Sequence, residues 1–114
     1  MAVLELSSTR HGDRTVVVVK GELDIVSRNQ FIAHLDGVLR EHGHKIILDL
    51  SGLSFIDTSA LSTVVSYWKH LSSEEGGLLA LAGAEYTNAR VLWITGLAKR
   101  LPMYDDVDAA LAAT

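Results

Sequence analysis

The segment KIILDLSGLSFIDTSAL, from Lys45 to Leu61, contains the changes of pattern that decide the fold. It opens with the apolar run Lys45 to Leu50, which has the length of a strand and, apart from Asp49, no polar face. A run of this kind predicts a strand that is buried on both faces, as in the middle of a helix-covered sheet. A turn is expected at Ser51 to Phe55, followed by an amphipathic helix from Ser59 to Leu71.

The residues before this segment predict a hairpin and a helix. Strands are expected at Val3 to Leu6 and at Thr15 to Lys20, joined by a turn at His11 to Asp13. The period then changes, and apolar residues recur at helical spacing until Gly43. Ser27 is expected to cap this helix.

The residues after the segment alternate strand and helix once more. SSEEGG breaks the preceding helix, and LLALAG, at Leu78 to Gly83, predicts a buried strand. A short helix is expected at Asn88 to Ile94, ended by Gly96. An extended edge piece, Leu101 to Tyr104, and a last helix capped by Asp105 or Asp106 complete the chain.

These elements predict an α/β fold in a single domain, residues 1–114. Their order is β-β-α-β-α-β-α-β-α, which gives about five strands and about four helices. Strands separated by helices require parallel connections, whereas the opening hairpin adds an antiparallel pair. We therefore expect a mixed sheet that is covered by helices.

The composition excludes several classes of function. Among 114 residues, 48% are apolar and 21% are charged, which is typical of a globular domain. The absence of cysteine excludes disulfides, thiolate metal ligands and cysteine nucleophiles. A net charge of −4 without a basic cluster argues against direct binding of nucleic acid.

No feature of the sequence indicates a membrane segment or a metal site. The start MAVLELSSTR is unlike a signal peptide, and no apolar run approaches the ~20 residues of a membrane span. The chain is therefore expected to be cytoplasmic, without insertion into a membrane. His42 and His44 form an H-x-H pair, but no third ligand accompanies them at a suitable spacing.

Asp57, Thr58 and Ser59 allow three interpretations. They are preferred residues for a helix cap, because their oxygens accept hydrogen bonds from unpaired backbone N–H groups. As catalytic residues they would need a base and an orienting group, and the sequence offers neither a G-x-S-x-G turn nor a recognisable histidine base. As a phosphorylation site they would gain about −1.5 to −2 charges at a helix start, which tolerates a phosphate.

Three blocks of the sequence resemble the STAS domain, and more narrowly the bacterial anti-sigma factor antagonists. These blocks are KGELDIVS (Lys20 to Ser27), IILDLSGLSFIDTSALSTVV (Ile46 to Val65) and ITGLAKRLPMYDDVDAAL (Ile94 to Leu111). They cover nearly the whole chain in the order of the family. The D-T-S-A-L core of the middle block is the most specific of the three.

The resemblance implies a binding protein and not an enzyme. Such a protein binds an anti-sigma factor that is also a serine/threonine kinase, and so frees a sigma factor in stress response or sporulation signalling. The kinase, which holds the ATP, phosphorylates the first hydroxyl residue after the Asp of the motif, and a metal-dependent phosphatase reverses the reaction. Carried over here, Thr58 is the phosphoacceptor, and Asp24, Asp57, Ser59 and Ala60 belong to the partner-docking surface. No cofactor or metal is implied for the chain itself.

Two other functions fit parts of the sequence. Soluble STAS proteins also serve as accessory subunits of membrane transport ATPases, and such a subunit would need no phosphoacceptor. A receiver-type phosphoaspartate domain would need an acidic pair after the first strand, and two strands here precede the first helix. The helix with Trp93 is apolar on both faces, so one face is expected to be exposed for a partner or a second copy.

Overall fold

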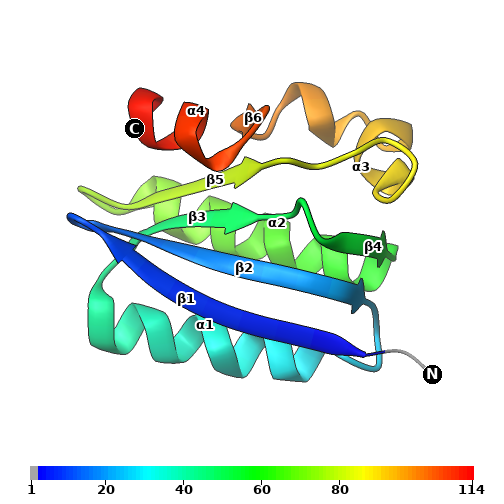
Figure 1. Cartoon of the computed structure of the whole chain (residues 1–114), viewed down its shortest axis with the longest axis horizontal. Helices are drawn as coiled ribbons and strands as arrows, with labels where there is room; N and C mark the ends of the chain where they lie inside the picture. The colour runs from blue at the N-terminus through cyan, green and yellow to red at the C-terminus, as the bar shows by residue number, and fades with distance from the viewer. Residues whose placement is uncertain (1–2) are drawn as a thin grey trace.

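The computed structural model describes residues 3–114, which form one mixed sheet with helices on both faces (Figure 1). The strand order is β1-β2-β3-β5-β6, and β4 pairs with the last part of β2. The strands are β1 Leu4–His11, β2 Arg14–Leu23, β3 Lys45–Asp49, β4 Leu53–Ile56, β5 Leu78–Ala82 and β6 Met103–Tyr104. The helices are α1 Arg28–His42, α2 Thr58–Ser73, α3 Arg90–Ile94, the 3-10 helix η1 Leu97–Lys99 and α4 Val107–Ala113. The predicted α/β class is confirmed.

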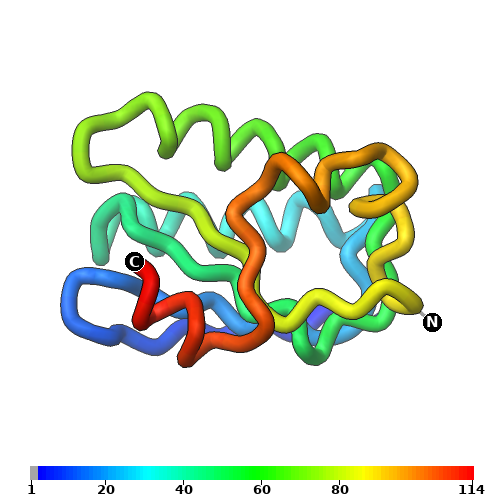
Figure 2. The backbone as a smooth tube through the Cα atoms, turned by 90° about the horizontal axis from the view of Figure 1, so that it is seen from above, coloured from blue at the N-terminus to red at the C-terminus, as the bar shows by residue number. Residues whose placement is uncertain are grey.

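The sheet separates a large core from a small one. Along β2, Val17 and Val19 pack in the large core under α1 and α2, whereas Val16 packs in the small core under α4. Figure 2 shows α2 and α4 on opposite sides of the strands. The central strand β3 is buried on both faces, as predicted, because Ile46 faces the large core and Ile47 the small one. Each such fully buried side chain contributes about 1.5–3 kcal/mol.

The sequence prediction missed one strand. The expected turn at Ser51 to Phe55 is confined to Ser51 and Gly52, and Leu53–Ile56 form β4. The cause is the length of β2, which is ten residues and extends beyond β3. Its last part pairs in parallel with β4, after a register shift between Gly21 and Glu22. Leu53 and Ile56 are buried at the two ends of the new strand.

The residues Gly43, Gly96 and Asp106 lie at helix ends, as predicted. Gly43 follows α1, and Asp106 caps α4 by accepting a hydrogen bond from the Ala109 amide at 2.8 Å. Gly96, with a φ of 79°, stands just after α3 and donates its N–H to the Trp93 carbonyl. The η1 helix that follows was not predicted. Within residues 3–114, no helix combines the length and apolar character needed to cross a membrane.

Candidate functional site

Asp57 occupies the N-cap position of α2 and also connects that helix to the loop before α1. Its backbone is extended, and its Oδ1 accepts a hydrogen bond from the Ala60 amide at 2.8 Å. Its Oδ2 accepts a second one from the Ile25 amide at 2.9 Å. The cap interpretation is confirmed for Asp57, and both carboxylate oxygens are used within the protein. A partner is therefore expected to contact the surface that Asp57 organises rather than its carboxylate.

Thr58 is the first residue of α2, and its side chain is exposed. Strand β4 places it there, since Ile56 at the strand end is buried and the chain turns outward at Asp57. The Thr58 hydroxyl forms no hydrogen bond with another residue of the described chain. It is therefore open to another molecule.

Ser59 and Ala60 point away from that open position. The Ser59 hydroxyl accepts a hydrogen bond from the Arg28 guanidinium at 2.8 Å, which joins α2 to α1. Ala60 is fully buried in the large core. Its methyl group therefore lies inside the fold, so a part of Ala60 in the docking surface, as the family resemblance implies, would not involve its side chain.

Asp24 organises the neighbouring loop, which runs from Asp24 to Ser27. Its Oδ1 accepts hydrogen bonds from the amides of Val26 and Ser27, both at 3.0 Å. The Ser27 amide is the main reason that the pKa of Asp24 lies below its usual value, so the carboxylate stays charged. Ser27 stands at the N-cap of α1 but makes no cap bond, because its hydroxyl donates to the Glu22 carbonyl at 2.8 Å. The expectation of a Ser27 side-chain cap is wrong for that reason.

The surroundings of Thr58 contain apolar side chains that face solvent. Ile25 and Val26 in the loop before α1 are 64% and 81% exposed, Phe55 of β4 is 49% exposed, and Ile94 of α3 is 75% exposed. The apolar pattern of α3 indicated one of them, whereas the other three come from segments that lack a helical period. Exposed apolar groups gathered at one place are typical of an interaction surface.

Between α2 and α3 lies a groove with a volume of about 360 Å³. Its apolar lining comes from Phe55, Ile56, Val91 and Ile94. Thr58 and Arg90 also line it. The phosphoacceptor candidate thus stands at the border of an apolar groove, which is a suitable place for a side chain of a partner protein.

The site does not have the arrangement of a hydrolase. In residues 3–114, the hydrogen bonds of Ser59 and the open hydroxyl of Thr58 involve no histidine or carboxylate that could act as a base. His42 and His44 lie elsewhere, hydrogen-bonded to Arg10 and to Glu74. No group of three or more His, Cys, Asp or Glu side chains in the described chain could hold a metal ion.

Known proteins match almost the whole chain. The sequence model of the STAS domain matches residues 5–110. An anti-sigma F factor antagonist of Paenibacillus polymyxa is 29% identical over 95% of this chain and 92% of its own length. A protein of Thermotoga neapolitana, provisionally named an anti-sigma factor antagonist, is 33% identical over 87% of this chain and 88% of its own. The crystal structure of an anti-sigma factor antagonist from Mycobacterium paratuberculosis is similar with a TM-score of 0.85, at 25% identity over 97% and 93% of the two chains.

Proposed function

Since the chain belongs to the STAS domain family, we propose that it acts as an anti-sigma factor antagonist: it binds an anti-sigma factor and thereby frees a sigma factor for transcription. The relatives that carry this name cover the same length of chain, which supports a function held by this one domain. In this role the protein is a cytoplasmic binding protein and not an enzyme. Asp24 and Asp57 shape the docking surface, and Ile25, Val26 and Phe55 supply its apolar contacts.

The observation that carries the proposal is the position of Thr58. Thr58 is exposed, its hydroxyl is free of hydrogen bonds to the described chain, and it lines the same groove as the exposed side chains of Phe55 and Ile94. A helix cap alone would explain Asp57 but not the exposed apolar residues around it. A protein that docks on these side chains covers Thr58, which makes this hydroxyl a suitable place for a switch.

The switch that we propose is phosphorylation by the partner itself. An anti-sigma factor that is also a serine/threonine kinase transfers the γ-phosphoryl group of its ATP to the Thr58 oxygen, with loss of the hydroxyl proton and release of ADP. The product carries about −1.5 to −2 charges in the middle of the contact surface. Burying that charge against the partner is unfavourable, and a loss of 1.4 kcal/mol lowers affinity about tenfold. A metal-dependent phosphatase would restore the free hydroxyl by hydrolysis.

The experiment is a comparison of tagged baits in the native cytoplasm, followed by reconstitution with the purified partner. The baits are wild type, Thr58→Ala, Thr58→Glu and Ser66→Glu. Ser66 is exposed farther along α2, so Ser66→Glu adds the same charge away from the groove. We expect wild type, Thr58→Ala and Ser66→Glu to retain an ATP-binding anti-sigma factor, and Thr58→Glu to release it. Purified partner and ATP should phosphorylate wild type but not Thr58→Ala.

Two outcomes would contradict the proposal. Equal retention of transport ATPase subunits by all four baits would favour the accessory-subunit function and leave Thr58 as an ordinary residue of a helix start. Equal retention of an anti-sigma factor by all four baits would keep the binding function but remove Thr58 from its regulation.

A further inference from the structure

Thr58 and Arg90 come from different elements but line the same groove. Thr58 begins α2, Arg90 begins α3, and the groove between them has a volume of about 360 Å³. Residue 90 follows residue 58 by 32 positions, so only the tertiary fold brings the two together. A phosphate on the Thr58 oxygen would extend from the α2 side of this groove toward the space that Arg90 borders.

The Arg90 guanidinium has no acidic partner within the described chain. It is exposed and lies over the face of the Tyr86 ring, with its Cζ 5.9 Å from the ring centre. The carboxylate contacts of basic side chains in residues 3–114 involve other residues, namely Arg14, His42, His44, Lys45 and His70. A charge-assisted hydrogen bond to a phosphate is stronger than a contact with an aromatic ring at an exposed position.

The other arginine near Thr58 is already committed. Arg28 donates to the Ser59 hydroxyl and holds α1 against the start of α2. Arg28 is not among the residues that line the groove, whereas Arg90 is. Arg90 is therefore the cation at this groove that is able to reorient.

We propose that Arg90 binds the phosphate once Thr58 is phosphorylated. This inference rests on the proposed function, in which Thr58 is the phosphoacceptor. The planar guanidinium of arginine pairs with two phosphate oxygens at once, so the contact fixes the side chain as well as neutralising charge. Moving from the Tyr86 ring to the phosphate places Arg90 across the groove between α2 and α3.

The pair changes what a partner meets at this surface. The phosphate and the guanidinium together cover the groove lined by Phe55, Val91 and Ile94. A partner side chain that fills the groove of the unmodified protein is then excluded by occupancy, in addition to like-charge repulsion. Arg90 thus holds the phosphate over the groove in the phosphorylated state.

The test uses protein that carries phosphothreonine at position 58, introduced during translation, and needs no partner or kinase. The ³¹P signal of the phosphate is titrated against pH in the phosphorylated forms of wild type, Arg90→Gln, Arg90→Lys and Arg40→Gln. Arg90 stabilises the phosphate dianion, so the loss of Arg90 raises the pH midpoint of the phosphate titration. We expect the midpoint of Arg90→Gln to lie about 0.5 pH units above that of wild type. Arg90→Lys, which keeps the charge, should stay close to wild type.

Arg40→Gln is the matched control, since Arg40 is an exposed arginine near the end of α1, away from the groove. The charge of Asp57 and the helix start of α2 also act on the phosphate, but they are the same in all four proteins. A second readout is the ¹H–¹⁵N signal of the Arg90 Nε–H, which should shift on phosphorylation in wild type. Equal midpoints in Arg90→Gln and Arg40→Gln, together with an unchanged Arg90 signal, would overturn the inference.

These readouts separate this inference from the proposed function. If Arg90 binds the phosphate but no anti-sigma factor is released, the proposed phosphorylation switch fails and the arginine contact stands. If phosphorylation releases the partner while the titration midpoints are equal, the function proposal stands and the phosphate acts by repulsion alone.

Discussion

The two ends of the sheet differ in what they expose. At one end, which we call the hairpin end, lie the turn between β1 and β2, the start of β3 and the ends of α1, α2 and α4 (Figure 1). At the other end, which we call the Thr58 end, lie β4, α3, the start of α2 and the loop before α1 (Figure 1). The ion pairs within residues 3–114 lie at the hairpin end. The large exposed apolar side chains of that range, among them Ile25, Val26, Phe55 and Ile94, lie at the Thr58 end.

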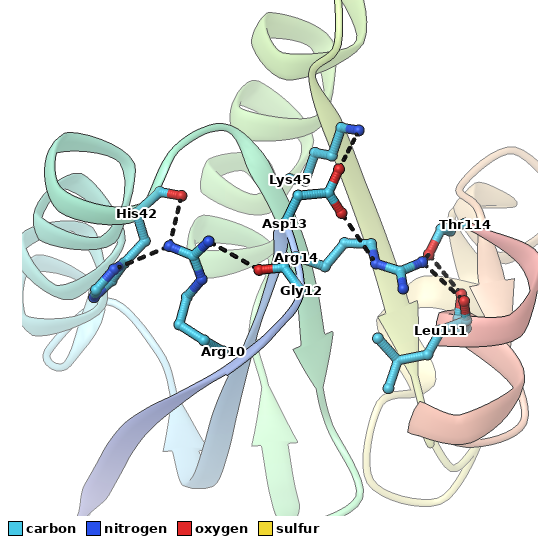
Figure 3. A network of polar contacts seen from close by, with 9 residues as sticks. Arg10, Gly12, Asp13, Arg14, His42, Lys45, Leu111 and Thr114 are labelled. Carbon is cyan, nitrogen blue, oxygen red and sulfur yellow. Dashed lines mark hydrogen bonds and ion pairs between the residues drawn. The ribbon is translucent and has the colours of Figure 1, made fainter.

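At the hairpin end, polar side chains from distant segments pair with one another and with backbone carbonyls (Figure 3). Lys45 pairs with Asp13 at 2.8 Å, and Arg10 donates to the carbonyls of His42 and Gly12. The Arg14 guanidinium donates to the Leu111 carbonyl at 2.9 Å and so holds the end of α4. Segments that are distant in the sequence are joined here by contacts within the chain, and none of these contacts requires a partner.

The Thr58 end uses its polar groups differently. Asp24 and Asp57 accept hydrogen bonds from backbone amides and so fix the loop before α1 and the start of α2. The apolar side chains of Ile25 and Val26 nearby are exposed to solvent. A surface that exposes apolar groups on a rigid frame gains free energy when another protein covers it. The hairpin end therefore contributes mainly to the stability of the fold, whereas the Thr58 end offers apolar side chains that a partner could cover.

The largest expected effect comes from removing apolar contacts at the Thr58 end. The double variant Phe55→Ala/Ile94→Ala should weaken binding of the anti-sigma factor about 100-fold, or ~2.7 kcal/mol, because both side chains border the groove. The melting temperature should change little, since both are exposed. Calorimetric titration and thermal unfolding measure the two quantities. Asp13→Ala at the hairpin end is the control and should leave affinity unchanged. Equal losses of affinity in both proteins would show that the Thr58 end is not the contact surface.

The hydrogen bonds of Asp57 hold the start of α2 and the loop before α1, which together carry that surface. Asp57→Ala loses the α2 cap and the bond to the Ile25 amide, so its free energy of unfolding should fall by about 2 kcal/mol. Asp106→Ala is the matched control because it loses a cap of the same geometry without a second bond, at ~1 kcal/mol. Urea unfolding measures both. If Asp106→Ala were as destabilising as Asp57→Ala, the bond to Ile25 would have no role in the frame.

A third substitution, Arg14→Ala, removes the hydrogen bond between the β1–β2 hairpin and α4. Arg14→Ala should lower the free energy of unfolding by about 1 kcal/mol, because the Leu111 carbonyl loses its donor. Amide hydrogen exchange should show the loss in α4, with α2 unaffected. Affinity for the anti-sigma factor should be that of wild type. A weaker complex would mean that the two ends are coupled.

The smallest effect is a difference in salt sensitivity between two aspartates. A hydrogen bond from Lys45, followed by its charge, lowers the pKa of Asp13, whereas backbone amides led by that of Ser27 lower the pKa of Asp24. Because each folded-state pKa is lowered, each carboxylate stabilises the fold above its unfolded pKa, near 3.9, and this contribution is lost as pH falls through the folded pKa. Raising the salt concentration to ~1 M should bring the pKa of Asp13 back toward its normal value and leave that of Asp24 low. NMR titrations in low and in high salt measure both pKa values. A parallel shift of both would contradict the assigned causes.

The sequence predicted those features that depend on neighbouring residues. The buried strand at Lys45 to Asp49, the Asp57 and Asp106 caps and the glycine stops follow from local patterns, and the structure confirms them. The burial of Ala60 could also have been found, since it lies one helical turn before Val64 on the buried face of α2.

The remaining features depend on contacts between distant residues. Strand β4 is a run of only four residues whose partner, β2, lies about 30 positions earlier, so no local signal separates it from a turn. The hydrogen bond that the Ile25 amide donates to Asp57 and the one that Arg28 donates to Ser59 span similar separations. They form only after the sheet has placed the two loops side by side. The docking surface belongs to this second group, which is why the sequence indicated Thr58 but not Ile25 or Phe55.

The most direct measurement is a calorimetric titration of the purified anti-sigma factor with two forms of this protein, one unmodified and one with phosphothreonine at position 58. Ser66→Glu serves as the control for added charge. We expect the phosphorylated form to bind at least ~10-fold more weakly, and Ser66→Glu to bind as the unmodified protein does. Equal affinity of the two forms would contradict the claim that the Thr58 end is a contact surface controlled by a phosphate.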